Sequence, residues 1–261
     1  MDTKKSFWQT RKSHALDIIF VTVAYFYIIL VVAPFEHIFP VLLSAYIIGG
    51  ILVVYILFIS QYLHKDTGAE RGFGTWKTLF IRTDNLKKSA RDVLLILTPI
   101  MVLSILLVSL MLGTFWTPKG GGFSEWLVEQ GILSEPNLFI DFIGQFLFYI
   151  LWGLIQQTLF LSFIHVHLRK VFPGNDRNNR NNRIKIALLT GAIFGGYHLF
   201  NFPLVAFTFI AGTFWAWYFY ETPNILTVSI SQGLGGTLSS MFIFNYNGWH
   251  MVVGWAGLGI G

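Results

Sequence analysis

The chain has 261 residues and a composition that excludes a soluble globular protein. Its residues are 54% hydrophobic and only 12% charged, whereas about a quarter of the residues in a soluble domain are charged. The length fits one bundle of about eight membrane spans of roughly 20 residues each. The absence of cysteine excludes a disulfide framework and thiolate chemistry.

The chain has a net charge of +5, and the distribution of its basic residues predicts membrane topology rather than a nucleic-acid partner. Apart from Lys119, the lysines and arginines lie in three segments, which are the N-terminal arm, residues 65–91 and residues 169–185. This clustering is typical of the positive-inside rule, by which basic loops stay in the cytoplasm. We therefore expect residues 1–261 to form a single all-α, multi-pass domain of the cell membrane. An even number of spans places both termini in the cytoplasm.

Residues 15–138 are expected to hold the first three spans and their loops. The apolar runs are Leu16–Val32, Val41–Leu63 and Val93–Leu112. No signal-peptide cleavage site follows the first run, which favours a retained span. The basic loop at residues 64–92 fits either an interfacial helix or an ordinary connection. The loop at residues 113–137 carries glutamates, so it is expected outside, with a short amphipathic piece around Trp126.

Residues 139–245 are the expected core, and residues 246–261 hold the last span. The apolar runs are Phe139–Leu168, Ile186–Phe200, Leu204–Tyr220, Ile225–Phe244 and Met251–Ile260. Glycines at 191 and 195, and a glycine cluster at 233–236, fall inside these runs. Small residues let helices approach closely in lipid, so both groups predict tight helix packing.

Four polar side chains lie inside apolar spans, where an unpaired polar group is unfavourable. They are Gln156, Gln157, His198 and Gln232. Gln156 and His198 each lie 13 residues from the basic loop at 169–185, which is roughly 20 Å along a helix. Gln232 lies roughly 12 Å into its span, counted from the turn at Asn224. The four could therefore converge in one layer, either as a functional site or as groups that only satisfy one another between helices.

The other titratable groups are weaker candidates. His165 and His167 are two residues apart and point to different faces of a helix, which makes them a poor metal pair. The remaining histidines at span ends or in turns are His37, His64 and His250. Asp141, near the outer end of its span, is expected to reach water. We find no acid–base pair inside the spans, a feature that would favour transport.

Three motifs lie on successive polar positions of the core: Gln156-Gln157-Thr-Leu-Phe-Leu161, Phe194-Gly-Gly-Tyr-His198 and Gln232-Gly-Leu-Gly-Gly236. Together they resemble the motifs of the CPBP family, the CAAX-processing and bacteriocin-processing intramembrane endopeptidases, also called the Abi family. The family pattern is Glu-Glu-x-x-x-Arg, then Phe-x-x-x-His, then His-x-x-x-Asn or Asp. Here the second motif matches through His198. Glutamines replace both glutamates and the second histidine, while Leu161 replaces the arginine and Gly236 the Asn or Asp.

The resemblance implies a membrane endopeptidase whose first glutamate activates water and whose second glutamate and two histidines form a metal or oxyanion site. Glutamine is no general base near neutral pH, and zinc catalysis needs about three ligands from His, Asp, Glu or Cys. We therefore expect a catalytically degenerate family member, surrounded by membrane lipid and without a cofactor, that binds a membrane peptide or a partner protein. Two alternatives remain open. One is an active CAAX-type endopeptidase with an altered centre, using zinc if active, and the other is an unrelated transporter or permease subunit.

Overall fold

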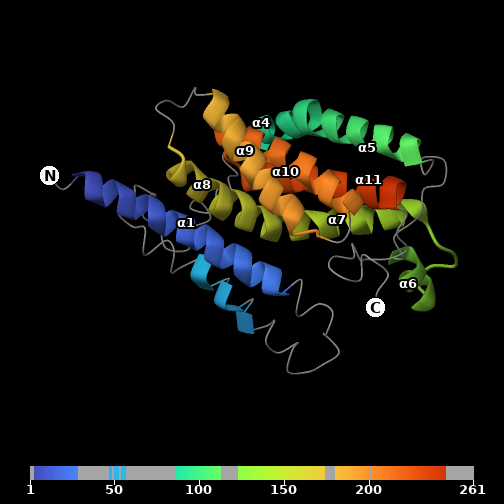
Figure 1. Cartoon of the computed structure of the whole chain (residues 1–261). Helices are drawn as coiled ribbons and strands as arrows, with labels where there is room; N and C mark the ends of the chain where they lie inside the picture. Colours follow the sequence, from blue (N-terminus) through green and yellow to red (C-terminus); the bar gives the residue numbers. More distant parts are fainter. Residues whose placement is uncertain are drawn as a thin grey trace. The chain divides into compact units, whose positions relative to one another are not determined.

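Helices and the turns that connect them make up the described part of the chain, and no strand occurs there (Figure 1). The computed structural model describes residues 3–28, 47–48, 50–52, 54–56, 86–112, 123–173, 180–199 and 202–244. The predicted all-α fold class is confirmed over these residues. The predicted last span and His37, His64 and His250 lie outside them, as does most of the basic loop at 64–92.

The chain divides into two compact units. The first contains α1 (Thr3–Tyr27), the π-helical stretch η6 (Thr158–His165), α8 (Val166–Val171), α9 (Arg180–Gly196) and α10 (Phe202–Glu221). The second contains α4 (Leu86–Asp92), η5 (Val93–Leu97), α5 (Thr98–Leu112), α6 (Phe123–Glu129), α7 (Leu138–Gln157), α11 (Ile225–Ser239) and η7 (Ser240–Phe244). The short helix α6 lies where the sequence predicts an amphipathic piece around Trp126, and the amphipathic character stays a prediction. A single domain over residues 1–261 stays a prediction.

Two helices of the described chain are long and apolar enough to cross a membrane. They are Lys87–Leu107, with 21 residues, and Leu138–Val171, with 34 residues. They overlap the third and fourth predicted spans. At a rise of about 1.5 Å per residue the second helix is about 50 Å long, whereas a hydrocarbon core is about 30 Å thick, so in a membrane it would have to tilt or protrude. The count of eight spans stays a prediction.

Asparagine caps begin the two helices that carry the glutamines of the second unit. At the start of α7, Asn137 Oδ1 accepts hydrogen bonds from the backbone N–H groups of Phe139 (3.0 Å) and Ile140 (3.2 Å). Asn224 caps α11 in the same way. Each cap satisfies backbone donors that have no partner within the helix, which explains why α7 and α11 start where they do.

Glycines set the close approach of α9 and α10 in the first unit. A Cβ atom at Gly191 would lie 2.0 Å from Thr213 Oγ1 and 2.7 Å from the carbonyl oxygen of Phe209. A Cβ atom at Gly195 would lie 3.0 Å from the carbonyl oxygen of Val205. Neither position has room for a larger residue without movement of the partner helix. The tight packing predicted for these two glycines is therefore confirmed.

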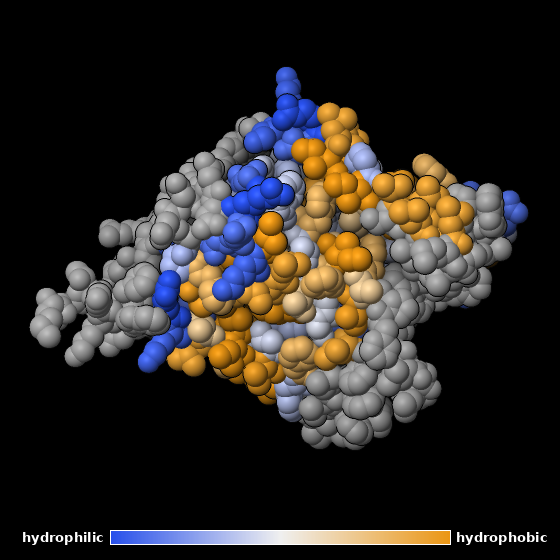
Figure 2. Space-filling view, turned by 45° about the horizontal axis from the view of Figure 1, so that its top comes forward, coloured by the Kyte–Doolittle hydropathy of each residue, from blue (hydrophilic) through white to orange (hydrophobic). Residues whose placement is uncertain are grey.

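Large apolar side chains point outward from the helices. Figure 2 shows wide hydrophobic areas on the face in view. On α7, Leu147, Leu151 and Ile155 recur every four residues and are 56%, 64% and 64% exposed. On α5, Leu103 and Leu107 are also more than half exposed. Surface of this kind would be unfavourable in water, and it fits helices that lie in lipid.

Candidate functional site

Three glutamines form a hydrogen-bonded chain inside the second unit. Gln157 Nε2 donates to Gln232 Oε1 across 2.6 Å. Gln232 Nε2 in turn donates to Gln156 Oε1. All three side chains are buried. Two residues from the last turn of α7 and one from the middle of α11 thus meet at a single point.

Small residues bring α7 and α11 close enough for these bonds. A Cβ atom built on Gly153, one turn before Gln157, would lie 3.3 Å from the Gln232 side chain. A Cβ atom on Gly236, one turn after Gln232, would lie 2.9 Å from the ring of Tyr149. Another on Gly233 would lie 2.5 Å from Ile150 Cγ1. The close packing predicted from the glycine cluster at 233–236 is confirmed, and it holds the glutamines in contact.

The donor set of the glutamine chain is suited to hydrogen bonding and unsuited to proton transfer. A carboxamide supplies an oxygen acceptor and an NH₂ donor, and neither group takes up a proton near neutral pH. Gln232 uses its oxygen toward Gln157 and its NH₂ toward Gln156. Because each of these groups has a partner, the buried amides are stabilised. Zinc prefers imidazole, thiolate or carboxylate ligands, so the three amides do not fit a zinc ion.

His198 follows α9 in the first unit. Its Nδ1 lies 2.9 Å from the carbonyl oxygen of Phe194, the first residue of the Phe-x-x-x-His motif. A carbonyl only accepts hydrogen bonds, so Nδ1 carries the proton and Nε2 is the basic nitrogen of the neutral ring. The Phe194 ring meets the imidazole edge-on, with 5.2 Å between centroids. The motif therefore fixes the orientation and the tautomer of the buried histidine.

The structure brings together three of the four polar residues that the sequence singles out. Gln156, Gln157 and Gln232 share one network in the second unit, whereas His198 belongs to the first unit. Within the first unit, over the residues described, no carboxylate and no second histidine hydrogen-bonds to His198. A common layer of four polar groups, and a functional role for each, stay predictions.

Asp141 corrects one sequence expectation. It is buried rather than exposed to water. Its two carboxylate oxygens accept hydrogen bonds from the backbone N–H of Ser124 (2.7 Å) and from Ser124 Oγ (2.9 Å). The expectation failed because it considered α7 alone, whereas the partner lies on α6.

The contact between Asp17 and His167 corrects a second expectation, that no acid–base pair lies inside the spans. Asp17 lies within the first predicted span and His167 within the fourth, and Asp17 Oδ2 is 3.1 Å from His167 Nε2. An acid–base pair inside the predicted spans therefore exists, contrary to the sequence-based expectation. His165 does face elsewhere, toward Thr190, which confirms that it and His167 point to different sides. His14 and Asp17 lie one helical turn apart on α1, but no feature of the sequence links either of them to His167.

A comparison with known protein families finds a match in the second half of the chain. Residues 140–235 match the family model described as type II CAAX prenyl endopeptidase Rce1-like. The matched range runs from α7 into α11 and includes every motif position from Gln156 to Gln232. The searches of curated proteins and of solved structures give no match. The predicted resemblance is thus confirmed over this range, which is similar to the CAAX prenyl endopeptidases, and the two long apolar helices fit a membrane location.

Proposed function

We propose that this chain, in which residues 140–235 form an Rce1-like domain, is a multi-pass membrane protein that lacks the peptidase chemistry of its family and binds a membrane peptide or a partner protein. The observation that carries the proposal is the hydrogen-bonded chain of Gln157, Gln232 and Gln156. It occupies the positions where the family pattern has two glutamates and a histidine. An unrelated permease is the weaker alternative, because residues 140–235 match an endopeptidase family model, although the Asp17–His167 pair is a feature that would favour transport.

The hydrogen bonds of the glutamine chain depend on amide groups. Gln157 and Gln232 both act as hydrogen-bond donors through their NH₂ groups. A carboxylate cannot donate, so two glutamates in these surroundings would leave the carbonyl oxygen of Gln232 facing another acceptor. The observed bonds need amides at these positions. The site is therefore built to stay neutral, which suits holding a ligand and does not suit activating water.

Binding within the membrane agrees with the surface of the domain. The outward stripe of Leu147, Leu151 and Ile155 on α7 lies along the same helix as the glutamines. In a membrane this stripe contacts lipid or an apolar segment of another chain. We propose no cofactor for the glutamine site, because none of its three side chains is a strong metal ligand.

A second candidate is an active endopeptidase with an altered centre. His198 favours it, because the bond from Nδ1 to Phe194 leaves Nε2 as a base. This reading also requires a carboxylate or a second histidine to act with His198.

The test is cleavage of a prenylated CAAX peptide by the full chain, purified in detergent. We expect no cleavage, together with saturable binding of the intact peptide or of a membrane peptide in a fluorescence anisotropy assay. Cleavage that disappears in a His198→Ala variant would overturn the proposal in favour of the second candidate. Absence of both cleavage and binding would overturn the binding role.

A matched variant, Gln156→Glu/Gln157→Glu/Gln232→His, restores the family residues in the second unit. Gly236 is left unchanged in it, because a side chain there would lie 2.9 Å from the Tyr149 ring. Gain of cleavage by this variant would support loss of chemistry at these three positions.

A further inference from the structure

A second group of polar side chains lies in the first unit, apart from the glutamines. His14 and Asp17 come from α1, and His167 comes from α8. The three are 3%, 5% and 8% exposed. Their nitrogen and oxygen ligand atoms all lie within 4.8 Å of one another. His14 and Asp17 lie outside the range matched by the family model, so the family pattern does not account for this group.

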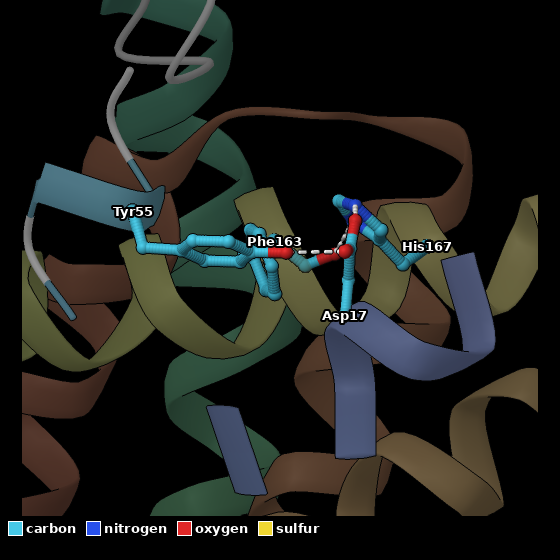
Figure 3. Close-up of polar contacts among 4 residues, drawn as sticks. All are labelled: Asp17, Tyr55, Phe163 and His167. Atoms are coloured by element: carbon cyan, nitrogen blue, oxygen red, sulfur yellow. Dashed lines mark hydrogen bonds and ion pairs between the residues drawn. The ribbon is translucent and has the colours of Figure 1, made fainter. Parts of the chain in front are cut away.

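The hydrogen bonds of His167 define what its ring can do. Nδ1 lies 2.8 Å from the carbonyl oxygen of Phe163, and Nε2 lies 3.1 Å from Asp17 Oδ2 (Figure 3). The carbonyl only accepts, so Nδ1 carries a proton. Nε2 then faces Asp17 Oδ2, which is also an acceptor, so a positively charged species has to lie between these two atoms. That species is either a second proton or a metal ion.

Asp17 is held in the same manner. Its Oδ1 accepts a hydrogen bond from the Tyr55 hydroxyl, while its Oδ2 faces His167 (Figure 3). A metal-binding histidine commonly donates its other N–H to a carbonyl or carboxylate, and a metal-binding carboxylate is itself hydrogen-bonded. Phe163 and Tyr55 provide both of these supporting contacts. They orient His167 Nε2 and Asp17 Oδ2 toward a shared position.

His14 offers a third possible ligand atom. Its ring lies edge-on to that of His167, with centroids 4.9 Å apart. An Asp17–His167 ion pair requires one imidazole, whereas a second imidazole at ligand distance is what a metal ion requires. Two imidazoles and one carboxylate suit zinc and related transition metals and do not suit calcium or magnesium, which prefer oxygen ligands.

We propose that His14, Asp17 and His167 form a binding site for a divalent transition-metal ion, with a fourth coordination position left open. Ligand atoms about 2.0–2.1 Å from a tetrahedral zinc ion lie about 3.3 Å apart, close to the 3.1 Å between His167 Nε2 and Asp17 Oδ2. The other separations between ligand atoms reach at most 4.8 Å and would have to shorten toward this value when the ion binds. The ion would link α1 to α8 and neutralise a buried carboxylate.

The experiment is metal titration of the full chain in detergent after removal of bound metal with a chelator. We expect one equivalent of Zn²⁺ per chain and a rise in Tm on adding Zn²⁺, because a ligand of the folded state stabilises it. Co²⁺ in place of Zn²⁺ should give a visible absorption band. His167→Gln and Asp17→Asn should each weaken Zn²⁺ binding by more than about tenfold, since even loss of a supporting contact costs about 10–100-fold.

His165→Gln is the control. His165 lies two residues from His167 but faces Thr190 and is not among the three ligands, so its variant should bind Zn²⁺ as the wild type does. His167→Gln keeps an amide that can donate to Asp17, which helps that variant to fold. Equal Zn²⁺ affinity in the wild type and in His167→Gln would overturn the proposal. A wild-type chain that takes up neither Zn²⁺ nor Co²⁺ would also overturn the proposal. This result does not depend on whether the variants fold. Asp17 and His167 would then form an ion pair without a metal ion.

Discussion

Gln157 Nε2 donates a hydrogen bond to Gln232 Oε1 across 2.6 Å, although the two residues are 75 positions apart in the chain. The bond joins the last residue of α7 to the middle of α11. Gln232 Nε2 donates a second hydrogen bond, to Gln156 Oε1. One amide thus links two neighbours, and the direction of both bonds depends on which end of Gln232 faces which partner.

This geometry predicts that one glutamate is tolerated and two are not. In Gln156→Glu the carboxylate still accepts from Gln232, and in Gln157→Glu rotation of the Gln232 and Gln156 amides restores a donor for each acceptor. With both changes, Gln232 has a single NH₂ group for two carboxylates. We expect an unfavourable coupling of about 1–3 kcal/mol in a double-mutant cycle, measured by unfolding of the detergent-solubilised chain. Additive single and double variants would show that the three amides do not act as one network.

Close packing of α9 on α10 makes Gly191 sensitive to substitution. In Gly191→Ala the new methyl group would lie 2.0 Å from Thr213 Oγ1 and 2.7 Å from two backbone atoms of α10, so the helices must separate. We expect a loss of about 1–3 kcal/mol in the free energy of unfolding. Gly196→Ala, on the same helix, is the control, since its methyl group would lie 3.6 Å from Phe26 Cζ in ordinary contact. Thermal unfolding of the two variants should differ clearly, and similar Tm values would contradict the packing described.

The contact between α6 and α7 depends on Asp141. Its carboxylate accepts from both the backbone and the side chain of Ser124, so Asp141→Ala leaves buried donors unpaired. We expect a loss of about 1–3 kcal/mol and faster proteolysis within α6, detected by limited digestion and mass spectrometry. Glu129→Ala, an exposed change on α6, should leave both the stability and the digestion pattern unchanged. Digestion of Asp141→Ala at the wild-type rate would contradict a structural role for this carboxylate.

The sequence predicts the features of this protein that depend on local spacing. Among the described residues, apolar runs predicted the positions of α5, α7, α9, α10 and α11. The four-residue spacing of Gly191 and Gly195 indicated where two helices touch. Counting residues from the basic loop for Gln156, and from the turn at Asn224 for Gln232, predicted that the two side chains could share one layer. These inferences succeed because helical rise and periodicity relate sequence position directly to depth and face.

Long-range partners were missed for an equally physical reason. Asp17 and His167 are 150 residues apart, and no local pattern in α8 reveals that α1 places a carboxylate beside it. Asp141 was expected in water because a carboxylate near a helix end can usually reach the surface, but Ser124 covers it. In both cases the side chain is satisfied by a segment whose position follows from tertiary packing rather than from the sequence around it.

Removal of the Tyr55 hydroxyl tests the proposed metal site without changing any of its ligands. It donates to Asp17 Oδ1 without being a ligand itself, so Tyr55→Phe removes one support of the carboxylate and leaves all three ligands in place. We expect Zn²⁺ affinity to fall about tenfold with the stoichiometry unchanged, measured by competition with a chromogenic chelator. Tyr197→Phe is the control, because it removes another tyrosine hydroxyl of the first unit, one bonded to Thr22, and should leave Zn²⁺ affinity as it is. If both variants lower the affinity equally, the effect is a general loosening of the unit and Tyr55 does not position the carboxylate for a metal ion.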